Sequence, residues 1–224
     1  MKTVKLVRSS VVIAAIASAA SMASSASGAV ATFTADNHYA LYSSTSGVLT
    51  FIGGNETGAG GNPGTYNWSL PETWQFDPGD TIFVAAWSDD STAQGLLGQV
   101  DFGGGVIYTG DPAWRFVGTG TTRSDGSPWP TAGDVGAVVD NADVNHLWSD
   151  PWVYLNNAPS TSPWGMVPGI DAQAKWMWGN TSGVSNPLIG PPQGDYQVFR
   201  LAVPTPGVGA LAAMGLLAGT RRRR

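Results

Sequence analysis

The stretch 111–168 is irregular and rich in Pro, Gly and Asp, and it contains four tryptophans besides Trp114, which belongs to an expected strand. Flat aromatic rings are the groups that proteins stack against sugar faces, and such sites need few charges. We therefore predict that these four side chains are the candidates for exposed carbohydrate platforms: Trp129, Trp148, Trp152 and Trp164. The alternative is that loop tryptophans fasten their loops to the body of the domain.

Acidic residues offer a second chemistry, glycoside hydrolysis, which needs two carboxyl groups roughly 5 to 9.5 Å apart. The sequence has sixteen Asp and Glu residues, so some will lie close together by chance. A secreted glycan-active hydrolase is therefore kept as the alternative to a non-enzymatic protein. The residues that could supply its paired carboxylates are Glu56, Glu72, Asp89, Asp90 and Asp101.

The sequence gives little support for a nucleophilic enzyme, a catalytic zinc site or a phosphate-binding loop. The chain has no Cys and only two His, His38 and His146, and neither the H-x-x-x-H nor the H-E-x-x-H spacing occurs. A nucleophile needs a neighbouring base, and a catalytic zinc needs clustered ligands, so both are improbable. We expect His38 to be a surface or packed side chain. No G-x-x-x-x-G-K loop is present either, so we predict that the protein is not an enzyme and has no obligatory cofactor.

A calcium ion is the one cofactor that the sequence suggests. Residues 140–145 place side-chain oxygens at several nearby positions, and hard cations bind clustered oxygens. The candidate ligands are Asp140, Asp143 and Asn145. The alternative, an Asx-rich turn capped by its own side chains, is favoured, because the spacing does not match an EF-hand loop.

The elements that position these residues are predicted to be strands. Apolar residues recur with period two, and no segment keeps helical spacing for three turns. Residues 81–87 are the clearest strand and follow a turn at 77–80 that contains Pro and Gly. Strands are also expected around 39–42, 48–52, 74–76, 100–102, 106–108, 114–116, 176–178 and 199–203. This set predicts an all-β antiparallel sandwich or barrel without helices, decorated by long loops within 111–168.

The N-terminal residues have the three zones of a secretory signal peptide. A basic start precedes an apolar run at 11–20 and a small-residue stretch at 21–31. The apolar run is about half the length of a membrane span. We expect a signal helix that signal peptidase removes by cutting between 26 and 31, which leads to export.

The C-terminal residues repeat this order in reverse. Val203, Pro204, Pro206 and Gly207 belong to a V-P-T-P-G motif, and an apolar stretch at 207–219 follows. As a helix this stretch reaches only about 20 Å, against roughly 30 Å of hydrocarbon core. The chain ends with four arginines, which stay on the cytoplasmic side: Arg221, Arg222, Arg223 and Arg224. We therefore expect transient insertion of this tail in the inner membrane.

This tail resembles the PEP-CTERM sorting signal of bacterial exosortase substrates, with Thr205 in place of the motif's Glu. The resemblance implies an exosortase-like transpeptidase as partner. An ordinary short membrane tail that stays attached is the alternative.

The formal net charge of −5 is the sum of two basic ends and a strongly acidic body. Without the two ends, the body retains four basic residues against all sixteen acidic ones, a net charge of −12. Such a surface repels phosphate backbones, so we exclude nucleic acid as a partner. The four basic residues of the body are Arg115, Arg123, Lys175 and Arg200.

The order of landmarks in the body resembles galactose-binding-domain-like jelly rolls. Residues 33–42 are similar to the F-x-A-D-N-x-Y-x-L-Y strand of these domains, and 94–98 to their G-L-L closure. The other landmarks are D-x-x-W-R at 111–115, P-W-G at 163–165, A-K-W-M-W at 174–178 and Phe199-Arg200. This resemblance implies a jelly-roll β-sandwich and carbohydrate binding.

Together these features predict three segments. Residues 1–28 are a signal peptide, 29–202 a β-sandwich domain, and 203–224 a sorting tail. The predicted function is that of an exported, non-enzymatic protein of the cell envelope, cell surface or extracellular matrix. Weak binding of extracellular polysaccharide is its candidate activity.

Processing at both ends is directly measurable. Mass spectrometry of the protein isolated from its host is expected to show a mature form that lacks the leader and residues 221–224. A mature form that retains the arginines would contradict the sorting signal.

Overall fold

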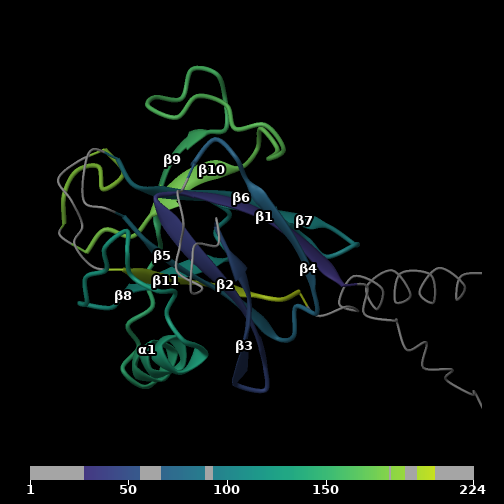
Figure 1. The fold of residues 1–224 in the computed structure, drawn as a ribbon, viewed down its shortest axis with the longest axis vertical. Coiled ribbons are helices and arrows are strands. Elements are labelled where there is room, and N and C mark those ends of the chain that lie inside the picture. The colour runs from purple at the N-terminus through teal and green to yellow at the C-terminus, as the bar shows by residue number, and fades with distance from the viewer. Residues whose placement is uncertain (1–27, 56–66, 89–92, 182, 190–195, 205–224) are drawn as a thin grey trace, which may run out of the picture.

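The computed structural model describes residues 28–55, 67–88, 93–181, 183–189 and 196–204. Two antiparallel sheets form its body (Figure 1). Sheet A has the order β4-β1-β6-β10-β9, and β7 also pairs with β6. Its strands are β1 (Ala29–Asp36), β4 (Glu72–Phe76), β6 (Gly95–Asp101), β7 (Val106–Tyr108), β9 (Trp152–Asn156) and β10 (Lys175–Trp178).

Sheet B has the order β3-β2-β5-β11-β8. The central strand β5 pairs with β2 on one side and with β11 on the other, and both pairs are antiparallel. The strands of this sheet are β2 (His38–Thr45), β3 (Val48–Gly54), β5 (Thr81–Trp87), β8 (Trp114–Gly118) and β11 (Gln197–Ala202).

The main core lies between the two sheets. Phe33 of β1 faces it from sheet A, and Leu41, Val84 and Phe199 face it from sheet B, all fully buried. Alternate residues of each strand point to this core, as expected for face-to-face sheets. The prediction of an all-β antiparallel sandwich is therefore confirmed.

A helix, α1 (Ala132–Val144), covers the outer face of sheet B (Figure 1). The prediction that the body has no helix is wrong. Val135, Val139 and Ala142 of this helix are buried in a second core, together with Tyr42 and Phe83 of the sheet. This apolar stripe follows the helical spacing but lasts only two turns, which is why period counting over three turns missed it.

The helix begins at a capping box. The Thr131 side chain accepts a hydrogen bond from the Asp134 amide at 3.1 Å, and the Asp134 carboxylate accepts one from the Thr131 amide at 2.8 Å. The T-x-x-D pattern was present in the sequence as a signal for this helix. The Asx-rich turn expected at 140–145 is likewise wrong, because residues 140–144 are helical and Asn145 is the C-cap of the helix.

The order of elements corrects two further expectations. Residues 33–42 are not one strand: β1 ends at Asp36 in sheet A and β2 starts at His38 in sheet B. The chain therefore changes sheet at Asn37, whose carbonyl accepts a hydrogen bond from the Asn55 side chain at 2.6 Å. The stretch 111–168 is also more regular than expected, since it contains β8, α1 and β9.

The described part of the domain ends just after β11. Val203 still donates a backbone hydrogen bond to Asp80, at 3.0 Å, and Pro204 is exposed. The predicted signal helix, most of the sorting motif, the apolar tail helix and the arginines lie outside the described residues. Within the described ranges, no helix is long and apolar enough to cross a membrane.

The capping box makes stability depend on pH. Hydrogen bonds from the Thr131 backbone and then from its side chain lower the pKa of Asp134 below its usual 3.8. A carboxyl group whose pKa is lower in the folded than in the unfolded protein stabilises the fold at pH values above its unfolded-state pKa. This contribution is lost as the pH falls through the folded-state pKa. Asp134→Ala should therefore reduce the free energy of unfolding at pH 7, and the difference from wild type should shrink below about pH 3.8.

Thr131→Ala provides the companion measurement. Loss of the N-cap oxygen should cost about 1 kcal/mol in urea unfolding at pH 7. Equal stability of the wild type and both variants at pH 7 would show that the capping box does not support the helix.

Candidate functional site

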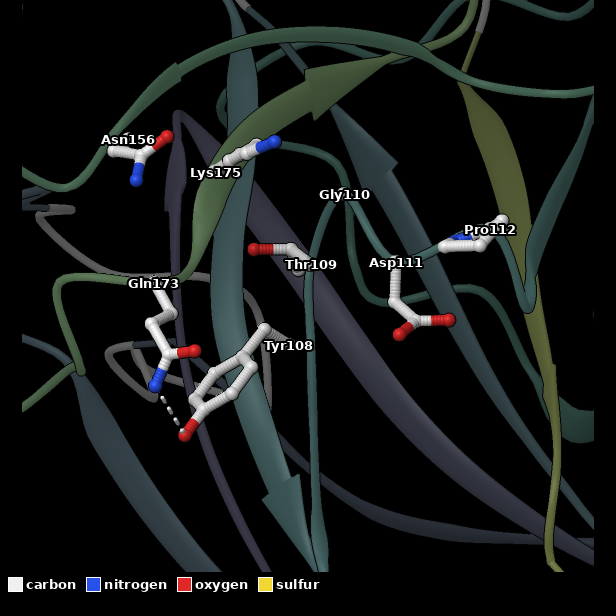
Figure 2. Close-up of a pocket in the computed structure, with 8 residues that line it drawn as sticks. All are labelled: Tyr108, Thr109, Gly110, Asp111, Pro112, Asn156, Gln173 and Lys175. Atoms are coloured by element: carbon white, nitrogen blue, oxygen red, sulfur yellow. Dashed lines mark hydrogen bonds between the residues drawn. The ribbon is translucent and has the colours of Figure 1, made fainter.

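A polar groove lies where the chain leaves β7 in sheet A and crosses to β8 in sheet B. This name covers two separate pockets, called its lobes below, which share residues 110–112 in their lining and are each about 330 Å³ in volume. The first lobe is shown in Figure 2 and is completed by Tyr108, Thr109, Asn156, Gln173 and Lys175. The second lobe is completed by Trp114, Arg115, Asp150, Pro151 and Val153.

The crossing is a tightly hydrogen-bonded turn. The Tyr108 carbonyl accepts bonds from the Asp111 amide at 3.2 Å and from the Trp114 indole at 3.0 Å. The Oδ1 atom of Asp111 accepts a bond from the Ala113 amide at 2.8 Å. Asp and Pro favour such turns, because the carboxylate bonds the amide two residues on. The turn thereby fixes the Asp111 carboxylate at the junction of the two lobes.

Gly110 is the residue at which this turn packs against Lys175 of β10 and Val153 of β9. Its φ is +84°, in the region that favours glycine. A Cβ atom there would lie 2.8 Å from Cβ of Lys175 and 3.1 Å from Cγ1 of Val153. Glycine is therefore needed both for the backbone conformation and to bring the turn against β9 and β10.

Lys175 is the first residue of β10 and is held by its backbone. Its amide donates to the Thr109 carbonyl at 3.0 Å, and it pairs with Asn156 of β9. In the part of the chain that the structure describes, its ammonium group has no ion pair, hydrogen bond or ring contact. The other described basic side chains of the body all have such partners: Arg115, Arg123 and Arg200.

Amide and hydroxyl groups complete the first lobe. The Gln173 amide donates to the Tyr108 hydroxyl at 3.4 Å (Figure 2), and the Asn156 amide donates to the Ala172 carbonyl at 3.2 Å. Both side chains keep an amide oxygen that accepts no hydrogen bond from the described residues. Tyr108 and Lys175 are half-buried, whereas Asn156 and Gln173 are exposed, so the lobe opens to solvent.

A buried asparagine supports the loop that carries Gln173. The Asn157 side chain donates to the carbonyls of Val167 and Ile170 at 2.9 and 2.8 Å and accepts a bond from the Val167 amide at 2.7 Å. Each polar group of this side chain thus ties down loop backbone that would otherwise be unpaired. The Asn157 side chain therefore holds Val167 and Ile170 of this loop in place from within the fold.

The predicted tryptophan platforms do not come together as one surface. Trp164 is only 3% exposed, so the expectation that it is a platform is wrong. Its ring stacks on Trp176 at 4.1 Å, and its indole donates to Asp36 at 2.7 Å. Trp152 is half-buried and stacks on Tyr154. Trp164 therefore attaches its loop to the core between the sheets, and Trp152, the first residue of β9, packs against the same core.

The other two tryptophans pack beside α1. The Trp148 indole donates to Asp143 at 2.6 Å, and the Arg200 guanidinium lies 4.1 Å from the centre of its ring. Trp129 is half-buried with its ring 5.1 Å from Phe51. Both therefore have structural contacts, which is the alternative considered for loop tryptophans.

The predicted calcium ligands lie along α1 and at its C-terminal cap. Asp140 is exposed, and the Asn145 side chain donates to Asn141. Oδ1 of Asp143 accepts bonds from both Trp148 and Arg200, the latter at 2.7 Å. Among the residues with described positions, no three His, Asp or Glu side chains gather in a way that could hold a metal. Calcium binding stays a prediction of the sequence.

Two of the five acidic residues considered for hydrolysis, Glu72 and Asp101, are among the residues that the structure describes. Glu72 pairs with Phe33 and faces the core side, where it accepts a bond from the Tyr39 hydroxyl at 3.1 Å. The pKa of Tyr39 is raised well above 10.0, mainly by burial of its own hydroxyl group and secondly by the negative charge of Glu72. Tyr39 therefore keeps its proton and stays a hydrogen-bond donor. Asp101 pairs with Val30, on the opposite face of the sheet from Phe33. These two carboxylates do not form a pair, and the other three, Glu56, Asp89 and Asp90, lie outside the described residues.

Both histidines are placed. His38 is fully buried, and its Nε2 lies 3.0 Å from Oδ1 of Asp125, which belongs to the loop before α1. His38 is thus a packed side chain, one of the two positions expected for it. His146 is exposed, just beyond the helix.

The groove residues were not among the predicted site residues. Two sequence signals pointed to them: Lys175 is one of only four basic residues in the body, and Asp111-Pro112 follows a glycine. Asn156, Gln173 and Lys175 lie next to this turn because β9 pairs with β10. The sequence pattern did not predict this pairing.

Comparison of the chain with protein-family models, with curated proteins and with solved structures gives no match.

Gly110→Ala tests the construction of the groove. The strained backbone and the contacts with Lys175 and Val153 should lower the free energy of unfolding by about 1 to 3 kcal/mol. Urea unfolding measures this. Gly104→Ala is the matched control, because a Cβ atom there meets nothing within 4 Å, and we expect a change within about 0.5 kcal/mol. Equal effects of the two substitutions would contradict the tight packing of the turn.

Proposed function

We propose that the protein is an exported, non-catalytic carbohydrate-binding β-sandwich that acts at the cell envelope or in the extracellular matrix. The observation that carries this proposal is the groove at the β7–β8 crossing. It is open, it is lined by polar side chains with spare hydrogen-bonding capacity, and an aromatic ring, that of Tyr108, forms part of its wall. Sugar recognition uses this combination of amide, hydroxyl and aromatic groups.

The groove is better suited to binding than the tryptophan surfaces that the sequence suggested. Tyr108, Asn156 and Lys175 stand on paired strands and Asp111 on a hydrogen-bonded turn, so these side chains are held in place before a ligand arrives. Holding polar groups in advance reduces the entropy lost on binding. Trp129, Trp148 and Trp152 are half-buried, and their rings instead contact other aromatic side chains of the protein.

Export and sorting belong to the same proposal. The three-zone N-terminus supports secretion, and the V-P-T-P-G motif with its apolar stretch and four arginines supports processing by an exosortase-like enzyme. The sandwich of two antiparallel sheets is consistent with the jelly roll of galactose-binding-domain-like proteins, which we propose as its fold family.

Binding of polysaccharide tests the function. The purified body, residues 29–202, is titrated with soluble polysaccharides on a glycan array and by calorimetry. Asn156→Ala and Gln173→Ala should each weaken the affinity about two- to tenfold, since each removes one hydrogen bond worth roughly 0.5 to 1.5 kcal/mol. Gln75→Ala is the control, because Gln75 is an exposed amide on β4 outside the groove.

Two results would contradict this function. The first is an array without a single carbohydrate ligand. The second is release of reducing sugar that is abolished by Asp111→Asn or Asp150→Asn, the two carboxylates that line the second lobe. That outcome would establish the hydrolase alternative instead.

A further inference from the structure

Strand β3 is an open edge of sheet B. It stands at one end of the strand order, and among the described residues it pairs only with β2. Figure 1 shows the β2–β3 hairpin at the rim of the sheet, beside α1. Val48 and Phe51 of this strand are 69% and 40% exposed. An edge strand presents unpaired N–H and C=O groups, so β3 can accept a further strand.

The other edges of the two sheets are protected. The far edge of sheet B, β8, is covered by the backbone of Ser149, which exchanges two hydrogen bonds of 2.9 Å with Phe116. In sheet A, the edge strand β4 carries the charged side chain of Glu72, directed inward. At the opposite edge, the Asn156 carbonyl of β9 accepts a hydrogen bond from the Thr161 hydroxyl. Charges and covering loops are common protections of edge strands.

Strand β3 lacks these protections. No charged residue and no proline lies between Ser43 and Asn55, the segment that contains it. The body as a whole carries −12, so two copies of the chain repel each other over most of their surfaces and approach most easily at an uncharged edge. The one register irregularity of β3 lies between Phe51 and Gly53, after the residues considered below.

The hairpin turn fixes the hydrogen-bonding pattern of β3. Ser46 and Gly47 have φ values of +50° and +83°, as in a two-residue type I′ turn. Thr45 and Val48 form the pair that closes this turn. The hydrogen bond across a β-turn joins its first and fourth residues, so the closing pair is a hydrogen-bonded pair.

This pattern shows which backbone groups of β3 point outward. Hydrogen-bonded and non-hydrogen-bonded pairs alternate along an antiparallel ladder, so Thr50 bonds toward β2, whereas Leu49 and Phe51 direct their N–H and C=O groups away from it. Ser44, which lies opposite Leu49, supports the assignment: its carbonyl accepts a hydrogen bond from the Asp80 amide at 2.7 Å, on the side away from β3.

These outward groups are complementary to a second copy of themselves. A two-fold axis beside Thr50 places Leu49 of one copy opposite Phe51 of the other, and each of the two resulting pairs exchanges both of its N–H···O bonds. Thr50 then lies opposite its own copy in a non-hydrogen-bonded pair. Aromatic–aliphatic pairs and Thr–Thr pairs across two strands are both favourable. In this register the outward residues of one strand use those of the other completely.

We propose that two copies of this chain associate through β3, antiparallel and centred on Thr50, and so join their two sheets B into one continuous sheet. An antiparallel pair of identical strands is self-complementary, as a two-fold symmetric interface requires. A strand pair of this length is a small interface, so the dimer forms weakly and depends on concentration. This inference is independent of the proposed carbohydrate binding.

A single introduced cysteine tests the register, because the chain has no Cys. In the full chain, Thr50→Cys places two thiols on either side of the two-fold axis. The Cα atoms of a non-hydrogen-bonded pair are about 4.5 Å apart, which a disulfide can span. Mild oxidation should therefore give a dimer on a non-reducing gel that a reductant converts back to monomer.

Val48→Cys is the matched control for this cross-link. Val48 lies on the same strand and, like Thr50, is exposed. In the proposed register, however, the two copies of this position are four residues apart along the strands, roughly 13 Å, which is too far for a disulfide. Val48→Cys should remain a monomer under the same oxidation.

Sedimentation of the full chain tests the association itself. The wild type should shift from monomer toward dimer between about 1 and 300 µM, and more strongly at about 500 than at 50 mM salt, because salt screens the repulsion between acidic bodies. Thr50→Glu places like charges opposite each other and should weaken dimerisation at least about tenfold. Gln75→Glu adds the same charge at an exposed position of β4 and should have no effect.

The outcomes decide for or against this interface. Cross-linking of Thr50→Cys but not of Val48→Cys, with loss of the dimer in a Thr50→Glu variant that thermal unfolding shows to be folded, would support it. Equal cross-linking of the two cysteine variants would overturn it. A dimer that Thr50→Glu leaves intact would also overturn it and point to another surface, such as the apolar tail, which all variants share. A wild type that stays monomeric at the highest concentration and salt would overturn it as well.

Discussion

Burial of sheet B on both of its faces is the constraint on which the rest of the structure depends. One face meets sheet A across the main core, and the other is covered by α1. Residues of β2 and β5 therefore alternate between two apolar environments, so that Leu41 and Val84 face one core while Tyr42 and Phe83 face the other. Without the helix, a row of aromatic and aliphatic side chains would be exposed, and large exposed apolar patches favour association.

The contacts that hold α1 against sheet B use two side chains that the sequence suggested as binding residues, Trp148 and Asp143. Arg200 on the outer face of β11 contacts both the Trp148 ring and the Asp143 carboxylate, which closes the helix against the sheet. Trp164 does the same for the loop before β10 through its stack on Trp176. Groups that have the chemistry for sugar or metal binding are here used for packing. The groove at the β7–β8 crossing is where polar side chains keep unused hydrogen-bonding capacity.

Much of the sheet structure could be predicted from local patterns. The apolar run Thr81–Trp87 is β5 with the bounds expected, and the turn before it has Gly79 at a φ of +59°. The helix and β9 were missed for a physical reason. The buried stripe of α1 is only two turns long and its helix contains Gly133 and Gly136, while β9 is an edge strand whose outward residues Val153 and Leu155 are apolar and exposed. Both patterns depart from the simple alternation that identifies a half-buried strand.

The sequence by itself determined the class of the fold, the acidic character of the body and the two terminal segments that predict export and sorting, because these follow from local composition and period. Only the tertiary structure decided which polar residues meet. Asp111, Asn156 and Lys175 lie far apart in the chain and come together because β10 pairs with β9 and the crossing turn packs against both. Strand order is set by long-range packing of whole faces, which no local pattern of residues encodes.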